Sequence, residues 1–149
     1  MVAMKTVRSC TLLLVVLVAG AFMCQAQQRP CSTPDANQAD REAGRVRTWD
    51  ALYHSYRRFA PRCDDGSIAE GYSESVARIL VDHWNTLPRL AELAEANHTF
   101  KKFVLRHVDA TMDSGDLYKI RERALHDCPS DQKNICGQLK RAAEHAINE

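Results

Sequence analysis

Apolar residues recur every three or four positions along most of the chain after residue 40, the spacing that places them on one face of an α-helix. The clearest stretch is 97–128, which predicts two helices joined by an acidic turn. Its apolar positions are Phe100, Phe103, Val104, His107 and Val108 in the first helix and Leu117, Ile120, Ala124 and Leu125 in the second. Asn97 and Ser114 are the predicted N-caps, because their side chains can accept N–H groups of a first helical turn.

The same periodicity predicts a long helix from Asp40 to Phe59, which ends before Pro61 because proline cannot continue a helix. Residues 27–39 form a leader ahead of it, in which Thr33 and Pro34 could start a helix of their own.

After a turn at 64–67, with Asp65 or Ser67 as the N-cap, a second helix is predicted to reach Trp84. Thr86 caps a short helix, and Ser130 or Asp131 caps the last one. No run of alternating β-branched residues predicts a strand. We therefore expect an all-α protein, a single compact bundle of five or six helices in residues 40–149.

The first 26 residues have the three parts of a secretory signal peptide. Lys5 and Arg8 precede an apolar run from Leu12 to Phe22, and Ala26 supplies a small residue before the expected cleavage. The run is short for a membrane span, which needs about 20 residues. Lipidation at Cys24 is the alternative to simple cleavage. We expect a periplasmic or secreted protein with no stable membrane span after cleavage.

Charge excludes some partners. The chain has 20 basic and 19 acidic residues, and removing Lys5 and Arg8 leaves 18 basic residues. The mature protein is therefore near neutral, which gives no support to nucleic-acid binding or to adhesion to an anionic membrane. We expect a protein partner and no cofactor.

Four cysteines remain after cleavage, an even number that indicates disulfides in an exported chain. They are Cys31, Cys63, Cys128 and Cys136. A bond between Cys128 and Cys136 closes a small loop between two helices and is favoured. Cys31 must double back along the predicted long helix to reach Cys63, so a bond from Cys63 to Cys128 or Cys136 competes with it.

Candidate catalytic and metal-binding residues are scattered. No histidine has another three or four positions away, and Asp109, Asp113 and Asp116 lack the alternating ligands and closing Glu of a calcium loop. A hydrolase would need two or more of four histidines to converge with carboxylates in one cleft. These are His54, His83, His107 and His126.

Five aromatic residues are the candidate contacts for a ligand or partner. They are Trp49, Tyr53, Tyr56, Tyr72 and Trp84. Aromatic residues at helical spacing favour a core, but between helices they could also line an apolar pocket for a small ligand.

Residues 58–71 and 103–116, followed by Cys128, Pro129 and Cys136, resemble small exported helical proteins of proteobacteria that have no firmly known activity. The resemblance implies an envelope location and supplies no catalytic residues. In size, export, helicity and disulfide content the chain is also similar, as a class, to periplasmic immunity proteins. Insect odorant-binding proteins are similar in size, but their six-cysteine framework is missing.

The sequence therefore predicts an exported, non-enzymatic helical protein that binds another protein, such as an immunity or inhibitor protein. A small apolar-ligand carrier and a hydrolase assembled across helices are the alternatives.

Overall fold

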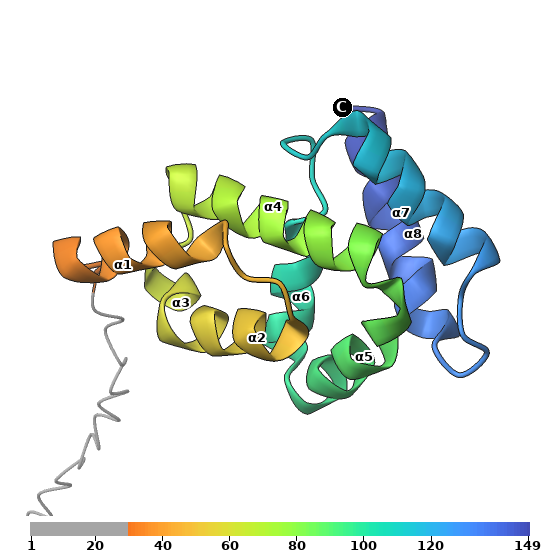
Figure 1. Ribbon diagram of the computed structural model, residues 1–149, viewed down its shortest axis with the longest axis horizontal. Coiled ribbons are helices and arrows are strands. Elements are labelled where there is room, and N and C mark those ends of the chain that lie inside the picture. The colour runs from red at the N-terminus through yellow and green to blue at the C-terminus, as the bar shows by residue number, and fades with distance from the viewer. Residues whose placement is uncertain (1–29) are drawn as a thin grey trace, which may run out of the picture.

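The structure, a computed structural model, describes residues 30–149 and is all-α (Figure 1). The predicted signal peptide, residues 1–26, lies outside the described residues. Eight α-helices and one 3₁₀-helix, η1, form the described part, and no strand occurs there. In order they are α1 Thr33–Ala43, α2 Trp49–Arg58, α3 Ala60–Cys63, α4 Gly66–Asp82, η1 Trp84–Thr86, α5 Leu87–Ala96, α6 His98–Arg106, α7 Ser114–His126 and α8 Lys133–Ile147. The all-α prediction is confirmed, with more helices than the five or six expected.

The predicted single helix from Asp40 to Phe59 is wrong, because residues 44–48 separate α1 from α2. Gly44 is the C-cap of α1, and Thr48 is the N-cap of α2, where its hydroxyl oxygen accepts the N–H of Ala51 at 3.3 Å. Such capping satisfies backbone groups that a continuous helix would bond internally, so the chain can reverse here. The boundary expected between leader and helical domain, at 39/40, consequently falls inside α1.

α1 lies along α4, and the two backbones approach closely at Gly71 (Figure 1). A Cβ on Gly71 would lie 3.0 Å from the Cβ of Ala43 and 3.0 Å from the backbone nitrogen of Gly44. The buried hydroxyl of Ser75 donates a hydrogen bond to the Ala43 carbonyl at the same crossing. Gly71 is therefore the residue that lets α1 pack against α4.

Two disulfides staple the fold, Cys31 to Cys63 and Cys128 to Cys136. The chain reversal at 44–48 returns the start of α1 to the end of α3, so Cys31 and Cys63 have Cα atoms 5.0 Å apart. The favoured Cys128–Cys136 bond is confirmed, and of the alternatives left open for Cys63 the bond to Cys31 is the one that forms.

The core is shared by nearly all the helices. Its largest fully buried side chains include Trp49, Leu52, Phe59, Tyr72, Phe100, Ile120 and Leu139. α7 and α8 lie side by side at one end of α4 (Figure 1). The indole N–H of Trp84 donates to the carbonyl of Asp127 at 2.9 Å and ties η1 to the end of α7. No helix within residues 30–149 is long and apolar enough to cross a membrane.

Three of the predicted caps can be compared directly with the structure. Asn97 caps α6 as predicted, with its side-chain oxygen accepting the N–H of Thr99 and of Phe100. The N-cap of α7 is Asp113, one residue before the predicted Ser114. α8 starts after Gln132 without a side-chain cap, so neither Ser130 nor Asp131 has the predicted role.

We expect removal of the Cys31–Cys63 disulfide to lower stability more than removal of Cys128–Cys136. The bonds span 32 and 8 residues, and a longer closed loop restricts the unfolded chain more. The chain-entropy relation gives losses of about 4 and about 2.5 kcal/mol, respectively. Urea unfolding of the two Cys→Ser double variants measures both free energies. Equal losses, or a larger loss for the 128–136 variant, would contradict this ranking.

We expect Gly71→Ala to destabilise the protein by about 1–2 kcal/mol, because the added methyl group meets backbone and side-chain atoms of α1. The clash must exceed the gain in helix propensity of about 1 kcal/mol. Gly44→Ala is the matched control, since its Cβ would meet nothing closer than 3.8 Å. Thermal unfolding of both variants tests the close approach, which an unchanged or raised stability of Gly71→Ala would refute.

Candidate functional site

A serine, a histidine and an aspartate come together beneath α6, from three separate elements. Ser73 lies on α4, His107 ends α6, and Asp64 follows α3. The Ser73 hydroxyl oxygen is 3.0 Å from His107 Nδ1. His107 Nε2 is 3.3 Å from Asp64 Oδ2 in hydrogen-bonding geometry, and 3.1 Å from Oδ1 outside that geometry. Arg106 pairs with the same carboxylate from the exposed side. The order of residue types is that of a hydrolytic triad.

The hydrogen-bond directions do not suit nucleophilic catalysis. Ser73 donates its proton to Asp109 Oδ2 at 2.9 Å, so its oxygen accepts from His107 Nδ1. A nucleophilic serine must instead donate to the imidazole, which takes its proton as the general base. The hydroxyl is therefore a link between His107 and Asp109.

Burial closes the network to a substrate. Ser73 and His107 are each 2% exposed. Aromatic rings cover the imidazole, with the ring centroids of Phe103 and Tyr72 at 4.4 and 5.8 Å from it. A buried polar group is costly unless it is hydrogen-bonded, and here the partners come from separate helices. The network therefore braces α4 and α6 against the turn that carries Asp64.

The sequence places His107 on the apolar stripe of its helix, and the structure shows the side chain buried there with Ser73 as a hydrogen-bond partner. Sequence reasoning missed Ser73 and Asp64 as the partners of His107. Asp64 stands beside Asp65, which caps α4 as one of the two predicted residues, so the pair was interpreted entirely as a turn. Asp65 caps α4 and Asp64 pairs with His107, and this difference follows only from where α6 lies in the fold.

The five aromatic candidates do not line one pocket. Tyr53, Tyr56 and Tyr72 pack on α6, with the Tyr53 and Phe100 ring centroids 4.9 Å apart and those of Tyr72 and Phe103 5.1 Å apart. Trp49 lies in the core at the start of α2, where its buried indole N–H has no hydrogen-bond partner among residues 30–149. The indole N–H of Trp84 donates a hydrogen bond to the backbone carbonyl of Asp127 at the end of α7.

The four candidate histidines also lie apart. His54 lines a groove between α1 and α2, and His83 lines a neighbouring hollow. His126 is exposed on α7, 3.5 Å from Glu122, while His107 is buried. Within residues 30–149 no group of three or more His, Cys, Asp or Glu could hold a metal ion. Asp109 and Asp113 accept nearby backbone N–H groups, as expected of turn residues.

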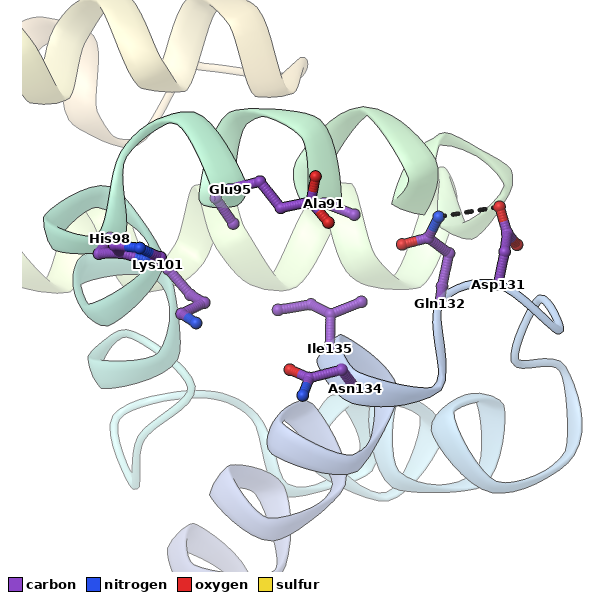
Figure 2. Close-up of a pocket in the computed structure, with 9 residues that line it drawn as sticks. Ala91, Glu95, His98, Lys101, Asp131, Gln132, Asn134 and Ile135 are labelled. Carbon is purple, nitrogen blue, oxygen red and sulfur yellow. Dashed lines mark hydrogen bonds between the residues drawn. The ribbon is translucent and has the colours of Figure 1, made fainter.

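Figure 2 shows a small hollow of about 110 Å³ between α5, α6 and the start of α8. Ile135 lies in its centre, and Glu95, His98 and Lys101 surround it together with Asp131 and neighbouring residues. At its edge the Gln132 side-chain amide donates a hydrogen bond to the Asp131 carboxylate. Its charges are mixed and its volume suits a few water molecules, so it selects no ligand class.

The largest of these hollows is an open groove of about 710 Å³ between α1 and α2, which we call the α1–α2 groove. It is lined by Arg41, Glu42, Arg45, Val46, Arg47, Thr48, Ala51, His54 and Ser55. Arg47 and Thr48 also line a second hollow of about 300 Å³ with His83 and Arg89, so the two surfaces are continuous. Arg41, Arg45 and Arg47 do not stand out in the sequence, because residues 40–59 are predicted there as one helix.

Comparison of the chain with protein-family models, curated proteins and solved structures found no match. The resemblance to exported proteobacterial proteins and to periplasmic immunity proteins therefore stays a prediction. What the chain does has to be inferred from the geometry of residues 30–149.

We expect Asp64→Asn to lower the free energy of unfolding by about 2–3 kcal/mol at pH 7, because it removes one partner of a buried pair. Burial raises the pKa of Asp64, but the hydrogen bond and charge of His107 and the charge of Arg106 outweigh burial, so the pKa of this carboxyl is lower than usual. Because the pKa of Asp64 is lower in the folded than in the unfolded protein, ionised Asp64 stabilises the fold at pH values above its unfolded pKa. This stabilisation is lost as the pH falls through the pKa of the folded protein.

The difference between wild type and Asp64→Asn should therefore shrink below about pH 4. Urea unfolding at pH 7 and at pH 3 measures it. Asp82→Asn, at the exposed end of α4, is the control and should show little loss at either pH. A difference for Asp64→Asn that is as large at pH 3 as at pH 7 would rule out the pairing.

Proposed function

We propose that this chain is an exported, periplasmic protein-binding module without catalytic activity, of the immunity or inhibitor class, and that it binds its partner at the α1–α2 groove. The observation that carries the proposal is that this groove is open and larger than the other hollows described, and lies between helices linked by the turn at 44–48 and, through α3, by the Cys31–Cys63 disulfide. Two disulfides suit an oxidising compartment outside the cytoplasm.

Both walls of the groove are fixed by covalent and polar links. The turn at 44–48 joins α1 to α2 at one end, and the Cys31–Cys63 disulfide joins the start of α1 to the end of α3 at the other. Between them the Arg58 guanidinium donates to the Gln38 side chain at 2.8 Å. A surface held in its binding conformation loses less entropy on association, and this is what a tight inhibitor requires.

The alternatives receive weaker support. A carrier of small apolar ligands would use the aromatic residues, but these are divided between the core and α6. A hydrolase would need an accessible nucleophile, and the serine beside His107 is buried and donates to Asp109. Residues that could do chemistry instead hold the fold together, which favours binding as the function.

We expect the oxidised protein, immobilised through its C-terminus, to retain one protein from an envelope extract of the organism that encodes it. The purified partner should then form a stable complex with it in size-exclusion chromatography with light scattering. If the partner is a toxin, an equimolar amount of this chain should abolish its activity. The reduced and alkylated protein is the control bait, because it lacks the braced groove.

Two results would contradict the proposal. One is that no retained protein reconstitutes a complex from purified components. The other is that the purified chain turns over ester, peptide or phosphoester substrates, and that a Ser73→Ala variant does not.

A further inference from the structure

The α1–α2 groove is strongly biased toward positive charge. Arg41, Arg45 and Arg47 line it together with His54, and Glu42 is the one acidic residue among its lining residues. The Glu42 carboxylate already accepts a hydrogen bond from the Gln38 amide at 2.9 Å. Clustered guanidinium groups repel one another unless counter-charge reaches them, so the groove attracts anions.

Five of the twelve arginines in residues 30–149 form ion pairs, and the three groove arginines are among the seven that do not. Arg62, Arg78, Arg89, Arg106 and Arg121 each have a carboxylate within 4.0 Å. Within the described part of the chain no such ion pair is formed by Arg41, Arg45 or Arg47. They are gathered on a protein whose residues 30–149 hold 17 basic and 19 acidic side chains, so carboxylates were available.

Arg47 is held in place without a carboxylate. Its guanidinium donates to the carbonyls of Gly44 and Val46, at 3.0 and 2.8 Å, and so anchors the side chain to the turn. A guanidinium has five N–H donors in a planar fork, and two such bonds leave others for a ligand. The turn that separates α1 from α2 therefore also positions a cation between the groove and the hollow beside it.

The size and lining of the groove favour a carboxylate-bearing peptide over a phosphate polymer. Nucleic acids and anionic bilayers present extended charge and are bound by long basic surfaces on strongly basic domains. Here the basic surface is one short groove on a near-neutral chain. Val46 and Ala51 add apolar surface beside the arginines, which suits the aliphatic parts of Asp and Glu side chains. Arginine also matches carboxylate geometry with two parallel hydrogen bonds.

We infer that the α1–α2 groove binds an acidic segment of a protein partner, whose Asp or Glu carboxylates pair with Arg41, Arg45 and Arg47. This inference rests on the proposed function and adds the chemistry of the bound segment. The Cys31–Cys63 disulfide ties the start of α1, one wall of the groove, to α3, which directly follows the other wall, α2.

The test uses the whole oxidised protein and two fluorescently labelled peptides. The first is rich in glutamate, and the second, its control, has glutamine at the same positions. Fluorescence anisotropy at low salt should show binding of the first peptide and little of the second. Arg41→Glu combined with Arg45→Glu should weaken binding about tenfold or more, or about 1.4 kcal/mol. Circular dichroism checks folding, and Arg45→Ala alone, outside the helices, should weaken binding in the same direction.

The matched control is Lys102→Glu combined with Lys133→Glu, which changes the net charge equally at exposed positions of α6 and α8 outside the groove. Its affinity should stay near that of the wild type. An equal loss in the control, or equal binding of both peptides, would overturn the inference. So would tighter binding of an oligonucleotide or of anionic vesicles, lost in the same arginine variants.

The two proposals can fail separately. If the reconstituted partner binds the Arg41→Glu and Arg45→Glu variant as tightly as the wild type, the inference about the groove is wrong and protein binding stands. If no partner complex can be reconstituted while the acidic peptide still binds through these arginines, the groove has the inferred chemistry and the immunity or inhibitor function is wrong.

Discussion

The reversal at residues 44–48 determines the positions of the surrounding elements, because it turns one amphipathic stretch into two antiparallel walls. Gly44 ends α1, and the Thr48 hydroxyl starts α2. With the chain reversed, α1 can lie along α4, where the absence of a side chain on Gly71 lets the backbones approach. The same reversal brings Cys31 to Cys63 and opens the groove between the two helices. One local feature thus sets the packing, the disulfide and the candidate binding surface.

A second constraint on the fold is that buried polar side chains need hydrogen-bond partners. Ser73 and Asp64 precede His107 by 34 and 43 positions, and each of the three side chains would be costly to bury alone. Together they satisfy one another, and the Asp109 carboxylate accepts the hydrogen bond that the Ser73 hydroxyl donates. The arrangement has residue types of a catalytic triad, but its order of donors and its burial give it a structural role. Residue type alone is therefore a poor guide to catalysis without accessibility and proton direction.

The arginines of this fold occupy two kinds of environment. Arginines next to carboxylates form ion pairs across the surface, whereas Arg41, Arg45 and Arg47 face an open groove. An exposed ion pair contributes little to stability, so leaving these arginines unpaired costs the fold little. The guanidinium N–H groups of these arginines are then available to donate hydrogen bonds to a partner. The proposed binding of a partner rests on the links around the groove and on three arginines that have no carboxylate within 4.0 Å among residues 30–149.

Sequence by itself determined the features that depend on near neighbours. Helical periodicity, the Asn97 cap, the short Cys128–Cys136 loop and the position of His107 on a buried stripe are all local. Tertiary structure decided the split of the predicted long helix, the Cys31–Cys63 bond, the partners of His107 and the separation of Trp49 and Trp84 from the tyrosines. The split is held by its local caps together with the contacts of Ala43 and Gly44 with α4. The other features depend on contacts between residues tens of positions apart, and spacing along the chain does not record which distant faces will meet.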